Sequence, residues 1–300
     1  MLGSLNDRSL NCRPCGGGFR IAASDVRASG AEAIAVGSFA VGCRGLRFRC
    51  LQFHIASSMS RHTVNSALAP LFGEPRVSSA LTSQLLAGEV LVVLEQRGDW
   101  LHVRGPDAYE GWTHRGYLAP TQGDEAAWHV SLGCVVRRAS GVQALPLGAR
   151  FAAECEVVSG EWLPIEALPE HFPANGEAVV NTARRFFTGT SYCWAGITPW
   201  GVDCSGLVQR CYALHGVALP RDAWQQAEAT QCASVDLHAP HAAGDLLFFS
   251  DREDRRITHV GLATGDGGMV HSALRRGGVV EERPDYLAAE YVGAGNRQLR

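Results

Sequence analysis

The chain of 300 residues lacks several features that would define other classes of protein. It has no run of about 18 uncharged apolar residues, which argues against a transmembrane helix. Its N-terminus lacks the basic and then apolar layout of a secretory signal, so we expect a cytoplasmic protein without a membrane partner. The formal net charge of −3 gives no indication of nucleic-acid binding. A composition of 46% hydrophobic and 19% charged residues fits a soluble protein of two or three modules, and we expect a monomer.

A metal-binding cysteine pattern is also lacking, although the chain has ten cysteines. Cys12 and Cys15 form one close pair, but Cys43 and Cys50 are too far apart for the common zinc arrangements. Reduced cysteines suit the cytosol. We therefore expect no zinc site. Residues 1–58 are rich in Gly, Ala, Ser and Arg without a sustained period, and we expect a poorly ordered extension there.

From about residue 60 the pattern changes to short strands separated by polar turns, which is typical of a small barrel. The expected strands are 89–95, 100–104 and 109–113. We assign residues 59–122 to this barrel. A weaker run of the same kind predicts a possible second barrel at 123–170. A proline-containing linker at 168–176 leads into the last domain, 175–300.

The motif Asp203-Cys204-Ser205-Gly206 places a cysteine at the predicted first turn of a helix. Asp203 is a good N-cap residue, so unpaired backbone N–H groups and the positive end of the helix dipole would favour a Cys204 thiolate. The same N–H groups can stabilise a tetrahedral oxyanion. Cys204 is therefore a candidate nucleophile. Cys211, two helical turns later, is expected to be an inert core thiol.

Two histidines are candidates for the base and for the group that orients it. His259 lies in an alternating apolar run at 257–263, and His271 lies in a second short strand at 269–273, after a glycine-rich turn. The arms of such a hairpin pair antiparallel, so both histidines can lie on one face of a sheet. Either histidine alone would more often be structural, but the joint arrangement favours catalysis.

Six sequence blocks occur in the order seen in the NlpC family of cell-wall cysteine peptidases. They are Tyr192-x-Trp194-x-Gly196 and the residues 203–208, 219–226, 244–249, 258–261 and 269–272. The resemblance covers residues 175–300. It implies a papain-like fold, in which the cysteine helix packs on an antiparallel sheet that carries the histidines. It also implies Cys204 as nucleophile, His259 as general base and His271 as the third, orienting residue.

The same resemblance implies roles for the neighbours of the nucleophile. Tyr192 matches a tyrosine that lies beside it, although a core aromatic next to Trp194 is an equally good interpretation. Asp203 and Ser205 match residues that flank the cysteine and help to hold the substrate. Ala195 is a departure, because many members have glycine there, and we expect it to be harmless.

Residues 83–120 resemble a bacterial SH3-like domain. This order of domains is similar to bacterial endopeptidases that cut γ-D-glutamyl bonds to meso-diaminopimelate or lysine in murein peptides with a free N-terminal L-alanine. In that subgroup the first SH3-like domain recognises the substrate amine through acidic and tyrosine side chains, and Glu89 and Tyr109 are the nearest matches. A solvated carboxylate and a barrel-packing aromatic are their alternatives. A carboxylate pair such as Glu89 and Asp203 would bind an ammonium that a blocked N-terminus cannot offer.

The sequence therefore predicts an α+β papain-like cysteine peptidase domain preceded by all-β SH3-like barrel domains, acting on small murein peptides. Hydrolysis through a cysteine nucleophile needs neither a metal nor an organic cofactor. One alternative is a peptidoglycan-binding SH3-like protein whose catalytic domain is inactive. Another is an acyltransferase whose thioester is resolved by an alcohol or an amine. The identity of the diamino acid is left open.

Overall fold

The computed structural model describes residues 60–121, 128–139 and 141–296. These residues fall within one compact unit of the chain. The extension expected at residues 1–58, with its four cysteines, lies outside the described residues. None of the helices in the described ranges is long and apolar enough to cross a membrane.

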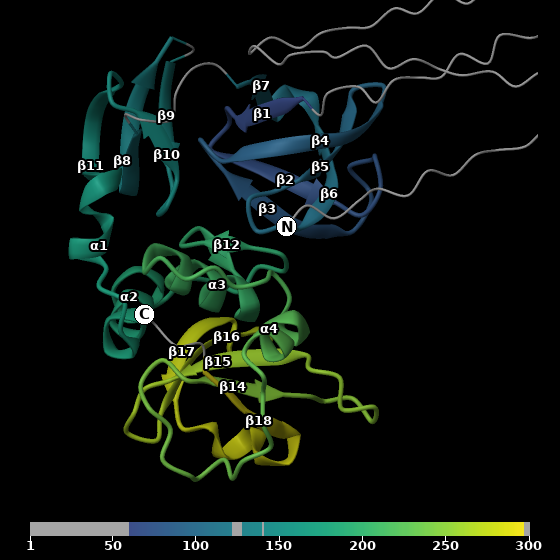
Figure 1. The fold of residues 1–300 in the computed structure, drawn as a ribbon, viewed down its shortest axis with the longest axis vertical. Helices are drawn as coiled ribbons and strands as arrows, with labels where there is room; N and C mark the ends of the chain where they lie inside the picture. Colours follow the sequence, from purple (N-terminus) through teal and green to yellow (C-terminus); the bar gives the residue numbers. More distant parts are fainter. Residues whose placement is uncertain (1–59, 122–127, 140, 297–300) are drawn as a thin grey trace, which may run out of the picture. The chain divides into compact units, whose positions relative to one another are not determined.

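The first region is an antiparallel sheet of seven strands in the order β3-β2-β6-β5-β4-β1-β7 (Figure 1). The strands are β1 (Arg61–Val64), β2 (Leu68–Phe72), β3 (Leu81–Leu86), β4 (Val90–Arg97), β5 (Trp100–Arg104), β6 (Glu110–His114) and β7 (Leu118–Pro120). Alternate apolar side chains form its core, among them Leu71, Leu91 and Val103. The three strands expected from the sequence are confirmed to within two residues, and Glu89 immediately precedes β4.

The second region is an antiparallel sheet of four strands, in which the long β8 pairs with the other three. The strands are β8 (Trp128–Arg138), β9 (Gly141–Leu145), β10 (Arg150–Ala152) and β11 (Glu156–Pro164). The linker predicted at 168–176 begins with a short helix, α1 (Leu168–His171). The assignment of 123–170 as a second SH3-like barrel and the other domain boundaries stay predictions.

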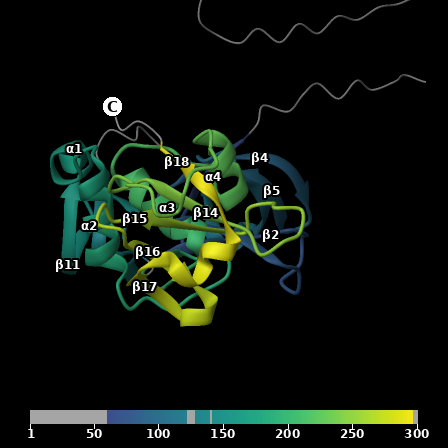
Figure 2. The same ribbon diagram turned by 90° about the horizontal axis from the view of Figure 1, so that it is seen from below.

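The third region is α+β, with three longer helices and a five-stranded antiparallel sheet in the order β17-β16-β15-β14-β18 (Figure 2). The helices are α2 (Gly176–Phe187), α3 (Cys204–Leu214) and α4 (Ala223–Ala229). The sheet strands are β14 (Leu246–Phe249), β15 (His259–Ala263), β16 (Met269–Ala273), β17 (Gly278–Glu282) and β18 (Tyr291–Gly295), and β12 (Ile197–Thr198) pairs with β13 (Gly201–Val202). Apolar residues of α3, such as Leu207 and Val208, pack against β15 and β16.

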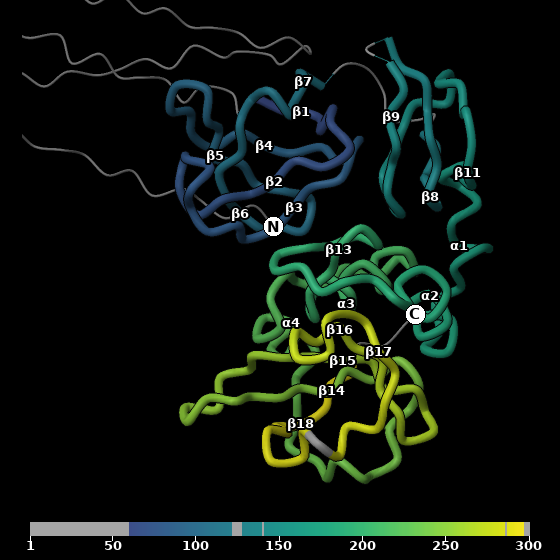
Figure 3. Tube along the Cα trace, turned by 180° about the vertical axis from the view of Figure 1, so that it is seen from behind, coloured from purple at the N-terminus to yellow at the C-terminus, as the bar shows by residue number. Residues whose placement is uncertain are grey.

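The predicted hairpin is confirmed, with one histidine on each arm. Leu262 on β15 pairs with Val270 on β16, so these two residues share a face of the sheet. His259 is three residues from Leu262 and His271 is one residue from Val270, so the pleat turns both histidines to the other face. The loop between β14 and β15, residues 250–258, extends well beyond the strands (Figures 1 and 3). Both features place side chains around the start of α3.

Candidate active site

Cys204 is the first residue of α3, as the sequence predicts. The Asp203 side chain caps the helix by accepting a hydrogen bond of 2.7 Å from the Gly206 backbone N–H. The first turn packs directly on the preceding loop, because a Cβ at Gly206 would lie only 2.2 Å from the Gly196 carbonyl oxygen. Only glycine fits there. Cys204 is a free thiol and is 8% exposed.

The two histidines are joined in a hydrogen-bonded chain that ends on a carboxylate. His259 Nε2 and His271 Nδ1 are 2.7 Å apart, and His271 Nε2 lies 3.0 Å from Glu282 Oε1. His271 is completely buried. The Glu282 carboxylate also contacts the Arg276 guanidinium at 2.8 Å. The orienting group of the base is therefore itself oriented by Glu282.

This chain determines which nitrogen of His259 is available. A carboxylate accepts hydrogen bonds, so the Nε2–H of His271 donates to Glu282. In a neutral imidazole the other nitrogen is then an acceptor, and His271 Nδ1 accepts from the Nε2–H of His259. The Nδ1 atom of His259 is left with its lone pair. His259 can thus accept a proton at Nδ1 while Glu282 compensates the positive charge through His271.

The thiol and the base are both neutral in the resting site. Burial, reinforced by the charge of Asp203, raises the pKa of Cys204 to about 12. Burial, followed by the influence of His271 and Arg275, lowers the pKa of His259 to about 3. Burial therefore outweighs the helix dipole, which alone would favour the thiolate. His259 has the protonation state of a base, and Cys204 loses its proton only when it reacts.

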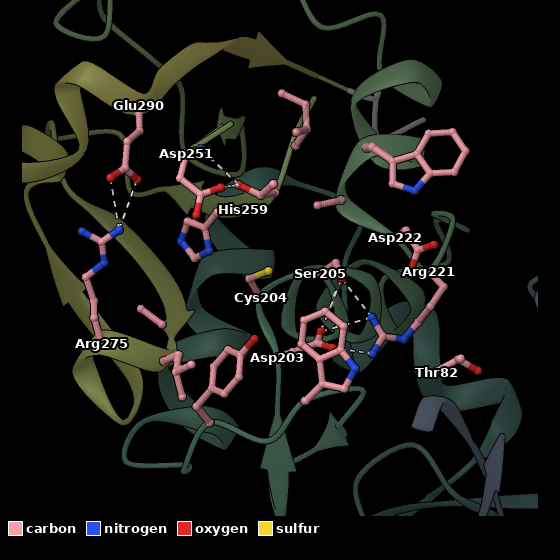
Figure 4. Close-up of a pocket in the computed structure, with 18 of the residues that line it drawn as sticks. Thr82, Asp203, Cys204, Ser205, Arg221, Asp222, Asp251, His259, Arg275 and Glu290 are labelled. Atoms are coloured by element: carbon pink, nitrogen blue, oxygen red, sulfur yellow. Dashed lines mark hydrogen bonds and ion pairs between the residues drawn. The ribbon is translucent and has the colours of Figure 1, made fainter. Parts of the chain in front are cut away.

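Cys204 and His259 line one cavity of about 930 Å³. In Figure 4, Cys204 lies between two groups of polar side chains. Asp203, Ser205, Arg221, Asp222 and Thr82 lie on one side, and His259, Asp251, Arg275 and Glu290 lie on the other. The cavity therefore has two polar ends with the nucleophile between them.

The structure brings four of the five predicted substrate-binding residues to this cavity. Tyr192, Asp203, Ser205 and Tyr109 line it together with Cys204, as do Leu81 and Thr82 of β3. Burial and the neighbouring Cys204 and Asp203 raise the pKa of Tyr192, so its hydroxyl keeps its proton and can donate. Tyr192 is thus a half-buried part of the cavity wall, and the neighbouring Trp194 is 69% exposed.

Glu89 is not among the residues that line the cavity. Its carboxylate accepts from the Leu86 backbone N–H at 2.9 Å and pairs with Arg210 of α3 at 2.8 Å. The structure thus does not form the expected pair of Glu89 and Asp203 around a substrate amine, because each carboxylate already has an arginine partner. The carboxylate that lines the cavity beside Tyr109 is Asp222, whose charge helps to raise the pKa of Tyr109 after burial.

Arg221 is the main structural residue of this end that the sequence did not single out, although it lies in the block 219–226. Its guanidinium is 2% exposed and donates to both Asp203 oxygens, at 2.6 and 3.1 Å. It also donates to Ser205 Oγ at 2.9 Å and to Ser83 Oγ of β3 at 3.1 Å. Arg221 therefore ties the first turn of the cysteine helix to the SH3-like region.

Ala195 adopts a φ of 61°, in the left-handed region that favours glycine. This explains the preference for glycine at this place in the resembling family. The methyl group costs roughly 1–2 kcal/mol in that conformation. The expected consequence of this departure is therefore a modest loss of stability.

Comparisons with known proteins agree with this geometry. The profile of the NlpC/P60 family matches residues 189–295, and that of the bacterial dipeptidyl-peptidase SH3 domain matches residues 71–115. A γ-D-glutamyl-L-lysine dipeptidyl-peptidase of Bacillus subtilis is 31% identical over 219 residues, which cover 65% of this chain and 73% of that protein. The Bacillus cereus protein of the same name is 26% identical over 257 residues, or 72% and 75% of the two chains.

Comparison with solved structures supports the same fold. The crystal structure of an NlpC/P60 family protein from Bacillus cereus superposes with a TM-score of 0.64 and 21% sequence identity, over 80% of this chain and all of that one. The predicted α+β papain-like domain with a preceding SH3-like domain is thereby confirmed. A hydrolytic site of cysteine and histidines on this fold leads to one conclusion: the chain belongs to the NlpC/P60 family and is a peptidase.

Proposed function

We propose that this peptidase hydrolyses the γ-D-glutamyl bond to an L-diamino acid in small murein peptides with a free N-terminal L-alanine. The names of the two Bacillus relatives support this substrate class. The observation that carries the proposal is the cavity, in which Cys204 lies beside an end walled by the SH3-like region. Trp194 also lines the cavity and donates a hydrogen bond of 3.1 Å from its Nε1 to the Leu81 carbonyl oxygen of β3. A walled end suits an enzyme that releases a dipeptide.

Attack begins from the neutral pair of thiol and imidazole. The proton of Cys204 passes to His259 Nδ1 as Sγ bonds to the γ-carbonyl carbon. The imidazolium is stabilised by His271 and, through it, by the Glu282 carboxylate. His259 then protonates the leaving amine, and the C–N bond breaks to give a thioester. This sequence needs a base that is neutral before attack, which the low pKa of His259 provides.

The oxyanion that forms on the carbonyl lies at the N-terminus of α3. Backbone N–H groups of the first helical turn point there, and the helix dipole favours negative charge. The Tyr192 hydroxyl in the same cavity wall is a further donor. In the second half of the reaction His259 takes a proton from water, the oxygen attacks the thioester carbon, and Cys204 leaves as the thiol. The second product is the L-alanyl-D-glutamate dipeptide.

The free amine of the substrate belongs at the walled end. Asp222 lies there beside the Tyr109 hydroxyl, with the Thr82 side chain on the same wall. An ammonium placed between a carboxylate and hydroxyls gains charge-assisted hydrogen bonds. An acetylated amine loses the charge and adds bulk, so the same groups would reject it. This end thus recognises the amine through Asp222, in the role that the sequence suggested for Glu89.

The test is mass spectrometry of the purified protein incubated with L-Ala-γ-D-Glu-meso-diaminopimelate and with its N-acetylated form. We expect release of L-Ala-D-Glu from the free-amine peptide alone. Cys204→Ala should abolish turnover and leave the fold intact. Asp222→Asn keeps a good N-cap for α4 and should reduce cleavage of the free-amine peptide about tenfold or more.

The controls separate the parts of the proposal. Retained cleavage by Cys204→Ala would refute the assigned nucleophile. Equal cleavage of the free and acetylated peptides would refute the amine-binding role of Asp222 and Tyr109. No cleavage of either peptide by the unaltered enzyme would refute the substrate class. Transfer of the dipeptide to an added alcohol or amine, visible as a mass shift, would identify an acyltransferase instead.

A further inference from the structure

The end of the cavity beyond His259 is charged in a pattern that the reaction itself does not require. Asp251 is the second residue of the loop after β14, Arg275 lies in the turn after β16, and Glu290 ends the turn before β18 (Figure 4). Arg275 Nη2 lies 3.2 Å from both Glu290 oxygens. Asp251 Oδ1 accepts from the Thr258 hydroxyl at 2.8 Å. All of these residues line the same cavity as Cys204.

Three separate segments are held together at this end. The Ser250 backbone N–H donates to the Glu290 carbonyl oxygen at 2.7 Å, which places Glu290 next to the Asp251 loop. Leu287 and Ile257 add apolar surface to the wall of the same cavity. The cavity wall here therefore combines apolar surface with two carboxylates and one guanidinium.

This end is where the leaving group must lie. His259 protonates the leaving amine, so the departing amino acid extends to the side of the cavity that His259 lines. The acyl part occupies the opposite side, which Asp222 and Tyr109 wall off. On the proposed function, the leaving group is an L-diamino acid. Its methylene groups would pass Leu287 and Ile257, and the end of its side chain would reach the charged residues.

We infer that Arg275, Glu290 and Asp251 form the subsite for the head of the leaving diamino acid and select a side chain that ends in both an ammonium and a carboxylate. This inference rests on the proposed function. The carboxylates of Asp251 and Glu290 attract the ammonium, and the Arg275 guanidinium binds the carboxylate. A lysine side chain offers only the ammonium and leaves Arg275 without a carboxylate from the ligand. The preferred substrate is therefore the meso-diaminopimelate peptide.

The Arg275–Glu290 pair is suited to exchanging partners. The two side chains are 51% and 29% exposed, so water already solvates both. Opening an exposed pair of this kind costs little. A ligand that carries both charges replaces each half of the pair with an equivalent contact. A side chain with a single charge replaces only one of these two contacts.

The experiment compares three peptides, L-Ala-γ-D-Glu followed by meso-diaminopimelate, L-lysine or L-norleucine. The ratios of kcat/KM between peptides cancel any effect on the shared catalytic steps. We expect the order diaminopimelate, lysine, norleucine for the unaltered enzyme. Arg275→Gln should lower the ratio of diaminopimelate to lysine about tenfold, and Glu290→Gln should lower the ratio of lysine to norleucine by a similar factor.

Arg184→Gln is the matched control, because Arg184 pairs with Glu281 on the surface and does not line the cavity. Both ratios should stay unchanged in it. If the kcat/KM ratio of diaminopimelate to lysine is also unchanged in Arg275→Gln, the inference is overturned. Cleavage of the peptides would still support the proposed function in that case. Product inhibition of the unaltered enzyme needs no variant: free meso-diaminopimelate should inhibit more strongly than L-lysine, and equal inhibition would contradict the inference.

Discussion

Two arginine–carboxylate pairs stand at opposite ends of one cavity, and their environments differ sharply. Arg221 and Asp203 are 2% and 8% exposed, and their shortest contact is 2.6 Å. Arg275 and Glu290 are 51% and 29% exposed, and their contact is 3.2 Å. The buried pair also includes the helix cap and two serine hydroxyls in its network.

The difference in burial suits the two pairs to different roles, the Arg221–Asp203 pair to stabilising the fold and the Arg275–Glu290 pair to binding a ligand. A buried ion pair has lost its hydration, so removal of one partner leaves an uncompensated charge in the interior. The Arg221–Asp203 pair can therefore hold the first turn of α3 in one position. An exposed pair keeps most of its hydration and contributes little to stability. The Arg275–Glu290 pair can therefore meet a ligand without disturbing the nucleophile.

Breaking the buried Arg221–Asp203 pair should cost the protein the most stability and activity. Arg221→Met leaves Asp203 charged and without its guanidinium, so the free energy of unfolding should fall by about 3–5 kcal/mol. Peptidase activity should fall with it, because Asp203 caps the helix that carries Cys204. Urea unfolding followed by circular dichroism measures the change.

A second variant tests the reason for that loss. Arg221→Met combined with Asp203→Asn removes the buried charge and keeps a residue that can cap the helix. Much of the lost stability should return. If the double variant is as unstable as the single one, the effect comes from lost packing of Arg221 rather than from an uncompensated Asp203 carboxylate.

Glu282 has features of both pairs, because its carboxylate is partly exposed and yet contacts a buried side chain. Glu282 is 22% exposed, pairs with Arg276 and accepts from the buried His271. Glu282→Gln keeps an acceptor and removes the charge that compensates the imidazolium. We expect kcat to fall about tenfold to a hundredfold with little change in KM. Steady-state kinetics on the diaminopimelate peptide measures both.

Glu281→Gln is the neighbouring control, because the adjacent Glu281 carboxylate pairs with Arg184 of α2 on the surface. Its kcat should equal that of the unaltered enzyme. Equal values of kcat in Glu282→Gln and Glu281→Gln would show that the carboxylate beside His271 does not position the base.

The sequence was most informative where local pattern determines geometry. The N-cap before Cys204 and the alternation around His259 and His271 are local features, and each gave the correct element. The pleat then required both histidines to share a face. Families conserve such blocks in order, which is why the resemblance led to the same fold.

Pairing between distant charges was not predictable in the same way. Arg221 and Ser83 are 138 positions apart, and no periodic pattern links them. Glu281 and Glu282 are adjacent, and only the register of β17 against β16 shows which of them reaches His271. Glu89 was placed at the substrate by analogy, but Arg210 on α3 takes its carboxylate. Which polar side chains pair depends on their distance in the folded protein, and a single sequence does not give that distance.

The weakest change in activity and stability is expected from the exposed Arg275–Glu290 pair. Arg275 is one of the charges that lower the pKa of His259, after burial and His271. His259 must be neutral to accept the proton of Cys204, so activity is lost as the pH falls through its pKa. The unaltered enzyme should therefore remain active at about pH 5, where an ordinary imidazole with a pKa near 6.5 is mostly protonated.

Arg275→Gln removes a positive charge near the base, so the pKa of His259 should rise and the acid limb of kcat/KM should move to higher pH, by up to about one unit. The lysine peptide is the suitable substrate, because the variant is expected to weaken recognition of the diaminopimelate carboxylate. Stability should change by less than about 1 kcal/mol, as for other exposed pairs. Arg184→Gln should leave the limb in place. If the acid limb of the pH profile stays in place in Arg275→Gln, the charge of Arg275 does not affect the pKa of His259. The Arg275–Glu290 pair would then act on the ligand alone.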